Sequence, residues 1–91
     1  MRELSIIIVS FNCRKLVLDC IHSIEKTVGQ VDLEIIVVDN ASVDGSAQAI
    51  RSTHPNIRLI ALDKNLGFGA ACNVGAKQAC GEYLLLLNPD T

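Results

Sequence analysis

The feature that most constrains the fold of this chain is a set of four short runs of Ile, Val and Leu that are apolar at nearly every position. A strand with one wet face alternates apolar and polar residues. A strand covered on both faces, as in a parallel sheet, instead reads as a continuous apolar run. We therefore predict four buried strands, at residues 4–11, 33–39, 57–62 and 83–88.

The segments between these runs have the spacing of helices. After the first run, four apolar residues recur at steps of four, three and four, which places them on one stripe of a helix: Val17, Ile21, Ile24 and Val28. Asn12 is the predicted N-cap of this helix and Gly29 is its predicted stop. Two further helices are predicted at residues 46–53 and 67–80, and Gly81 marks the end of the second.

Strands that alternate with helices form a parallel sheet through right-handed crossovers. The predicted class is therefore α/β, with a Rossmann-like three-layer α/β/α architecture in one small domain. In such a sheet the carboxyl ends of all strands lie along one edge, which is where ligands bind. Polar residues follow each predicted strand, and three acidic residues are expected at this edge: Asp39, Asp63 and Asp90.

Composition argues against several classes of partner. The net charge of the 91 residues is -2 and aromatic residues are few, so neither phosphate attraction nor base stacking indicates nucleic acid. No run approaches the roughly 18 apolar residues of a membrane span, and the apolar start lacks the cleavage site of a signal peptide, so a cytoplasmic location is expected. The four cysteines are expected to be reduced and mostly buried, with a zinc site or a disulfide framework as the less favoured alternatives.

Two familiar patterns are incomplete. The segment "GFGAAC" at residues 67–72 is similar to a dinucleotide fingerprint, but its sixth position is Cys72 and it follows the third strand instead of the first. A receiver module would carry an acidic pair after the first strand, where this chain has Ser10, Phe11 and Asn12. A nicotinamide-dependent oxidoreductase domain and a non-catalytic nucleotide-binding or receiver-like module are thus the alternative functions.

Three longer segments together form a more specific pattern: "SIIIVSFN" at the first strand, "VVDNASVDGS" after the second, and "NLGFGAACNVGAKQACGEYLLLLNPDT" from the third loop onward. In this combination the chain resembles a family 2 glycosyltransferase of the GT-A fold over essentially all of its length. The Asn-Pro-Asp at residues 88–90 resembles the variant of the D-x-D motif found in rhamnosyltransferase-like members.

The resemblance implies the nucleotide-binding half of the GT-A fold, with strand order 3-2-1-4. It also implies a reaction, which is the transfer of a sugar, with inversion, from a nucleotide-sugar donor that is UDP- or dTDP-linked. The acceptor would be a saccharide or a lipid-linked molecule in cell-surface polysaccharide synthesis.

Roles for individual residues follow from the same resemblance. Asp39 would accept a hydrogen bond from the ring N–H of uracil, thymine or guanine, and its alternative role is to cap its own loop. Phe11 would stack on the base or else pack in the core, while Ser10 and Asn12 would line the same pocket. The segment that lines the nucleotide site in relatives contributes Asn65, Gly67 and Asn73.

At the position of the D-x-D motif, Asp90 is the expected metal ligand, and Asn88 is expected to contact the donor sugar or diphosphate. A divalent cation, Mg²⁺ or Mn²⁺, is expected because an unscreened carboxylate–phosphate pair about 4 Å apart costs about 4 kcal/mol at an effective dielectric of about 20. Oxygen ligands suit both ions.

No residue of 1–91 is a credible general base, which inverting transfer requires. The chain is therefore expected to be the donor-binding portion of a longer enzyme, truncated at the D-x-D-like motif and inactive by itself. The whole protein is expected to work in the cytoplasm or at the inner face of the membrane. The last strand is expected to leave an open sheet edge through which copies of the chain associate.

Overall fold

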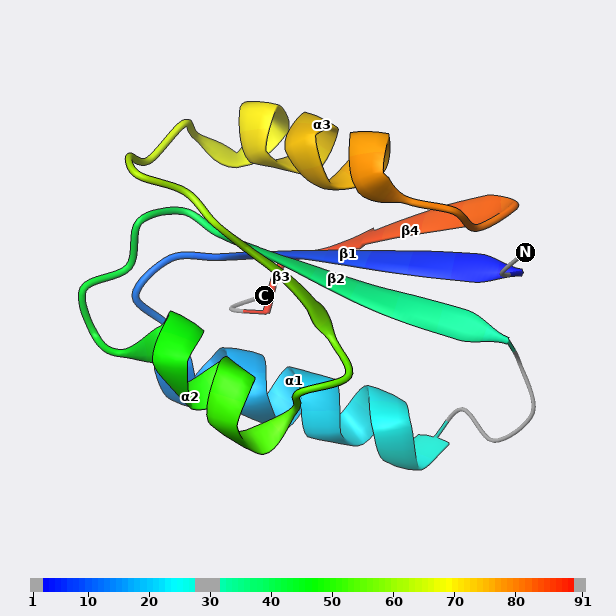
Figure 1. Cartoon of the computed structure of the whole chain (residues 1–91), viewed down its shortest axis with the longest axis horizontal. Coiled ribbons are helices and arrows are strands. Elements are labelled where there is room, and N and C mark those ends of the chain that lie inside the picture. Colours follow the sequence, from blue (N-terminus) through cyan, green and yellow to red (C-terminus); the bar gives the residue numbers. More distant parts are fainter. Residues whose placement is uncertain (1–2, 28–31, 90–91) are drawn as a thin grey trace.

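A computed structural model describes residues 3–27 and 32–89 and places a four-stranded parallel sheet between two helical layers (Figure 1). The strand order is β3-β2-β1-β4, and every neighbouring pair is parallel. The predicted α/β class and the 3-2-1-4 order are confirmed. The elements are β1 (Leu4–Ser10), α1 (Arg14–Thr27), β2 (Leu33–Asp39), α2 (Ser46–Thr53), β3 (Arg58–Ala61), α3 (Phe68–Gln78) and β4 (Tyr83–Leu87).

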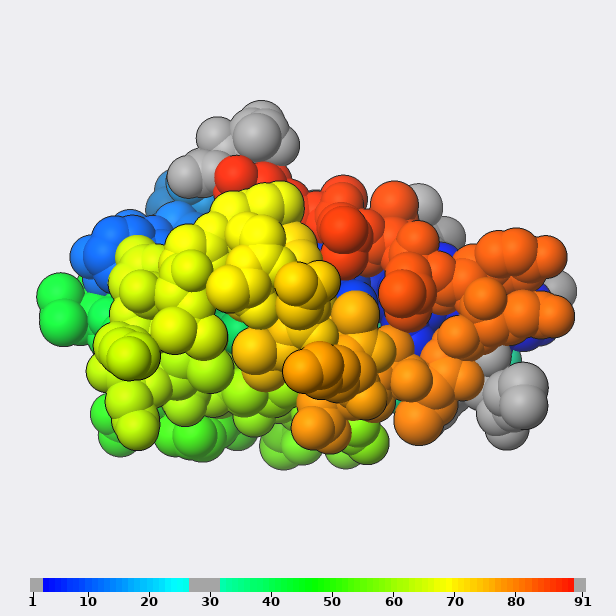
Figure 2. All heavy atoms as spheres, turned by 90° about the horizontal axis from the view of Figure 1, so that it is seen from above, coloured from blue at the N-terminus to red at the C-terminus, as the bar shows by residue number. Residues whose placement is uncertain are grey.

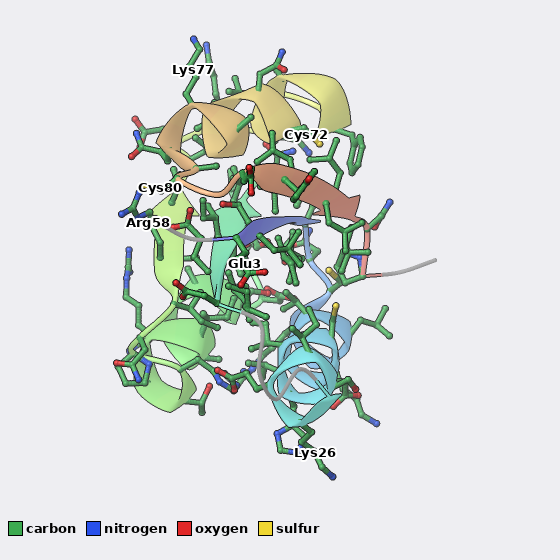
Figure 3. All side chains as sticks on the ribbon, turned by 90° about the vertical axis from the view of Figure 1, so that its right-hand side faces the viewer. Glu3, Lys26, Arg58, Cys72, Lys77 and Cys80 are labelled. Carbon is green, nitrogen blue, oxygen red and sulfur yellow. The ribbon has the colours of Figure 1, made fainter. Side chains whose placement is uncertain are left out.

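Successive residues of the central strands point to opposite faces of the sheet, which explains why these strands are apolar throughout. Ile6 and Ile8 of β1 pack in a core with α1 and α2, whereas Ile7 and Val9 pack in a second core with α3. Figure 3 shows the layers from the amino end of the strands, with Lys26 of α1 and Lys77 of α3 pointing outward on opposite sides. Both faces of β1 and β2 are thereby removed from water.

The apolar stripe predicted for the first helix is the face of α1 that meets the sheet. Val17 and Ile21 are fully buried and Ile24 packs at the margin of the same core. Val28 and Gly29, the predicted end of the stripe and of the helix, lie outside the described residues. The cap prediction is wrong. The backbone carbonyl of Cys13 accepts the first helical hydrogen bond, from the Val17 amide, so Cys13 and not Asn12 is the N-cap.

The fourth strand differs from its prediction as a strand covered on both faces. Leu84 and Leu86 are 52% and 49% exposed on the α3 side, and Leu85 is 44% exposed on the side of α1 and α2. Figure 2 looks onto the α3 layer and shows the orange-red atoms of β4 beside the helix and not beneath it. Within the described residues the helices cover both faces of β1 and β2, whereas β3 has no fully buried residue and β4 is exposed except at Leu87.

We expect copies of this chain to associate through β4, because the strand combines an unpaired edge with exposed leucines. Light scattering over a concentration series should show a mass that rises above that of the 91-residue monomer. Leu85→Lys should reduce this association, since edge lysines oppose strand pairing. A wild-type mass that stays monomeric at the highest concentration would contradict the expectation.

The cysteines are less buried than predicted. Cys72 alone is buried, Cys13 and Cys20 are half-buried, and Cys80 is exposed. Burial raises the pKa of the Cys72 thiol, and burial followed by the nearby Cys13 raises that of Cys20. Within residues 3–27 and 32–89, no helix is long and apolar enough to cross a membrane.

Candidate functional site

The carboxyl ends of the first three strands lie side by side. Ser10, the last residue of β1, is the register partner of Asp39 at the end of β2, and Asp39 is in turn the partner of Ala61 at the end of β3. The loops that follow these strands gather at the left end of the molecule in Figure 1. β4 joins the same edge, with Leu87 opposite Ile8. This edge is where an α/β sheet offers its backbone ends and loop side chains to a ligand.

Asp39 is the buried acidic residue among the described residues of this edge. It is 2% exposed, and both of its carboxylate oxygens accept hydrogen bonds from Ser42. The Ser42 hydroxyl donates to Oδ1 at 2.6 Å and the Ser42 amide donates to Oδ2 at 3.0 Å. Asp39 therefore caps its own loop, which is the alternative role predicted for it, through hydrogen bonds from Ser42. Each carboxylate oxygen retains a second lone pair for another donor.

The loop after β1 is joined to the loop after β2 by reciprocal hydrogen bonds. The Asn12 amide donates to the Ser42 hydroxyl at 2.9 Å, and the Val43 amide donates to the Asn12 side-chain oxygen at 2.8 Å. Asn12 has a φ of 49°, in the left-handed region that asparagine tolerates better than most residues. The Asn12 side chain, predicted to cap the first helix, thus holds the second loop in place.

Asp44 connects the same two loops from the other direction. Its carboxylate accepts the Arg14 amide at 2.9 Å, at the start of α1, and the Ser46 amide at 3.0 Å, at the start of α2. The Ser46 hydroxyl also donates to it, and this hydrogen bond, followed by those from the backbone amides, lowers the pKa of Asp44. One carboxylate therefore satisfies free amides at the first turns of two helices.

Asn40 was not singled out from the sequence, yet it fastens the third loop to the sheet. Its side chain is directed to the α3 side and is nearly buried. The side-chain oxygen accepts the Leu66 amide at 2.9 Å, and the side-chain nitrogen donates to the Gly67 carbonyl at 3.2 Å. The only available sequence signal was a polar residue directly after a buried strand, which is common in wet loops.

Replacing Asn40 with aspartate should lower the free energy of unfolding by about 1–3 kcal/mol, because the nearly buried side chain would then place a second acceptor, and no donor, against the Gly67 carbonyl. Chemical denaturation at neutral pH would measure the change. Asn56→Asp, at an exposed turn, is the matched control and should have little effect. Equal stability of the two variants would refute the proposed role of Asn40.

The remaining predicted nucleotide-site residues are distributed over the three loops and α3. Phe11 is 47% exposed, so it is available at the surface and is not a core residue. Ser10 is fully buried, with Oγ 3.5 Å from Cys13 Sγ. The Asn65 side chain accepts the Gly67 amide at 2.8 Å, while Asn73 is exposed midway along α3.

Gly67 is a predicted site residue whose backbone conformation favours glycine. Its φ of 84° and ψ of 167° lie where side-chain-bearing residues are strongly disfavoured, and α3 begins at the next residue. This glycine therefore permits the turn into the third helix, which runs over residues 68–78 and not over the predicted 67–80.

The predicted metal position falls at the border of the described structure. Asn88 is exposed directly after β4, and Asp90 lies outside the described residues. Within residues 3–27 and 32–89, no group of three or more His, Cys, Asp and Glu residues is arranged to hold a metal ion. Of the Asn-Pro-Asp motif the structure describes Asn88 and Pro89, and Asn88 carries an amide oxygen of the kind that hard cations accept.

A surface hollow elsewhere in the molecule is unrelated to this edge. It is lined by Ile24, Leu33, Ile57 and Arg58, at the amino end of the strands. Arg58 there donates to the Gln78 carbonyl at 2.8 Å and so ties β3 to the end of α3. The loops that carry the predicted site residues lie at the opposite end of the sheet.

Comparison with known proteins identifies the class to which this fold and edge belong. The model of the family "Glycosyl transferase family 2" matches residues 5–91, and the chain belongs to that family. Two curated relatives are each 32% identical: the succinoglycan biosynthesis protein ExoO of Rhizobium meliloti, over 97% of this chain, and the teichoic acid poly(glycerol phosphate) polymerase of Staphylococcus epidermidis, over 99%. The chain spans 25% and 13% of the lengths of these two relatives.

Two of the similar solved structures are complexes with a nucleotide-sugar. The TarS 1–349 structure from S. aureus, in complex with UDP-GlcNAc, matches with a TM-score of 0.86 at 29% identity, over 97% of this chain and 26% of that one. The mannosyltransferase PcManGT from Pyrobaculum calidifontis, in complex with GDP-Man and Mn²⁺, matches with a TM-score of 0.83 at 27% identity, over 98% and 28%. The resemblance to family 2 and the GT-A fold expected from the sequence is thereby confirmed.

Proposed function

We propose that this chain is the donor-binding part of a glycosyltransferase that moves a sugar from a nucleoside diphosphate to a saccharide or lipid-linked acceptor in cell-surface polysaccharide synthesis. The observation that carries the proposal is the Asp39 carboxylate, fixed at the carboxyl edge of the sheet in the loop after β2. Its support comes from family membership and from relatives named for teichoic acid and succinoglycan synthesis.

The nucleobase is recognised through Asp39, in this proposal. A carboxylate accepts hydrogen bonds only, so it favours uracil and thymine, which carry N3–H, and guanine, which carries N1–H, over cytosine, which has no ring N–H there. Phe11, about half exposed at the end of β1, supplies a face for the base to stack on. UDP- and dTDP-sugars are the favoured donors, and UDP-GlcNAc and GDP-Man in the two related structures both carry such a ring N–H.

The diphosphate end of the donor is proposed to lie where β4 ends. Asp90 would hold Mg²⁺ or Mn²⁺ there, with Asn88 toward the donor sugar or diphosphate. A bound divalent cation would offset the charge between carboxylate and phosphates and stabilise the departing diphosphate. The Mn²⁺ in the related mannosyltransferase structure supports a divalent ion at this place.

The chain by itself is proposed to bind donor without turnover. Inverting transfer needs a group that removes the proton of the acceptor hydroxyl. Neither acidic side chain that the structure fixes at the edge is proposed as that group, because Asp39 is assigned to the nucleobase and Asp44 joins the starts of α1 and α2. The whole protein is proposed to act in the cytoplasm or at the inner face of the membrane.

Titration of the chain with UDP, dTDP, GDP, CDP and NAD, with and without MnCl₂, tests the proposal. We expect UDP or dTDP to bind at least about tenfold more tightly than CDP, since one hydrogen bond to a charged group contributes about 1.5–3 kcal/mol. Manganese should tighten the binding of the diphosphates. Preferred binding of NAD would favour the nicotinamide-dependent alternative, and binding of no nucleotide at all would overturn the proposal.

A further inference from the structure

Among residues 3–27 and 32–89, the side-chain contacts that orient the Asp39 carboxylate come from Ser42. Two donors of that residue, its hydroxyl and its amide, reach the two carboxylate oxygens at 2.6 and 3.0 Å. A carboxylate held at one oxygen can turn about its bond to Cβ, whereas one held at both oxygens has a fixed plane. Ser42 therefore determines which way the free lone pairs of Asp39 point.

The same hydroxyl also anchors the neighbouring loop. It accepts the Asn12 amide at 2.9 Å while it donates to Asp39, so its proton has a defined direction. Asn12 directly follows Phe11, the proposed stacking residue, and is further held by the Val43 amide. Ser42 thus connects the proposed base acceptor to the loop that carries the proposed stacking face.

The backbone around this hydroxyl is held in a conformation that needs support. Asn12 and Ala41 have φ values of 49° and 64°, both in the left-handed region, and Ala41 is the residue before Ser42. Non-glycine residues in this region cost free energy that surrounding contacts must offset. The hydrogen bonds of Ser42 and Asn12 supply such contacts on both loops.

We propose that Ser42 is a positioning residue that determines the nucleobase selectivity of the site. By fixing both oxygens of Asp39, it presents a lone pair in one direction, where a ring N–H is accepted and the ring nitrogen acceptor of cytosine is repelled. Without the hydroxyl the carboxylate can rotate away from an unfavourable base, so UDP binding weakens more than CDP binding does. This inference rests on the proposed function.

The test compares Ser42→Ala and Ser42→Thr with the wild-type chain, and measures UDP and CDP binding by chemical-shift titration. Ser52→Ala, at an exposed position of α2, is the matched control. We expect Ser42→Ala to weaken UDP binding about fivefold and to bring the ratio of the two dissociation constants, about tenfold or more in wild type, to within about threefold, because one hydrogen bond to the carboxylate is lost. Ser42→Thr, which keeps the hydroxyl, should restore the wild-type ratio.

The selectivity ratio separates positioning from a general loss of structure. Ser42→Ala that weakens UDP and CDP by the same factor, or that leaves both unchanged, would overturn the inference while leaving the proposed function standing. Wild type that binds UDP, dTDP and GDP no better than CDP would overturn the base-recognition role of Asp39, and the inference with it. Thermal unfolding of Ser42→Thr, expected to match wild type, verifies that the hydroxyl is tested in a folded chain.

Discussion

Gly81→Ala is expected to destabilise the fold by about 3 kcal/mol or more, a large part of the 5–15 kcal/mol that holds an ordinary domain together. A β-carbon at Gly81 would lie 2.5 Å from the backbone nitrogen of Ser5 and 2.8 Å from the backbone carbon of Leu4. Backbone atoms in the central strand cannot move aside as a flexible side chain can. Gly81 also donates its amide to Ser5 Oγ at 2.8 Å, and that hydroxyl donates to Glu34 at 2.6 Å.

Gly69→Ala is the matched control, because it makes the same chemical change within the first turn of α3. A β-carbon there would meet no atom within 4 Å, so alanine should stabilise the helix by up to about 1 kcal/mol. Denaturant unfolding followed by circular dichroism would measure both variants. The two substitutions should have opposite signs, and a Gly81→Ala chain as stable as wild type would show that α3 and β4 are not joined as described.

Asp39→Asn is expected to weaken UDP binding by about 10- to 100-fold, the equivalent of losing one hydrogen bond to a charged acceptor. The amide has the same shape, so the loop can keep a hydrogen bond from Ser42 to the remaining oxygen. It presents an N–H₂ group where the carboxylate presented only acceptors, so CDP should bind as well as UDP or better. Isothermal titration with the two nucleotides would measure this reversal.

Asp19→Asn, on an exposed position of α1, carries the same change of charge and should leave both affinities unchanged. This control distinguishes recognition at Asp39 from a general electrostatic effect of one lost negative charge on a phosphate ligand. If Asp39→Asn also left UDP binding unchanged, the nucleobase would have to be recognised elsewhere on the chain.

The elements of the fold were predictable because their signals are local. Continuous Ile and Val runs predicted β1 and β2, and the spacing of Val17 and Ile21 predicted the buried face of α1. The prediction was wrong for β4, whose leucines are as apolar as those of a buried strand but are exposed. An apolar sequence shows that a strand is suited to burial. Whether the strand is buried depends on which helices pack against it.

The location of the site could be predicted from the sequence, but its hydrogen bonds could not. Strand ends of a parallel sheet must meet at one edge, so Asp39 and Asn12 could be assigned there from the order of the elements. The roles of Ser42 and Asn40 could not, because serine and asparagine after a strand are ordinary loop residues. Asn12 has a side chain suited to both a helix cap and a loop bridge, and its partner Val43 is 31 positions away.

The sequence by itself determined the class of fold, the order of its elements and the edge of the sheet where the predicted site residues lie. These features depend on periodicity and turn residues, which act over a few positions. Only the tertiary structure decided which donors meet which acceptors: Asn12 with Ser42 across 30 positions, and Asn40 with Gly67 across 27. A hydrogen bond depends on distance and direction in space, and these are set when the helices pack on the sheet and bring loops from different strands together.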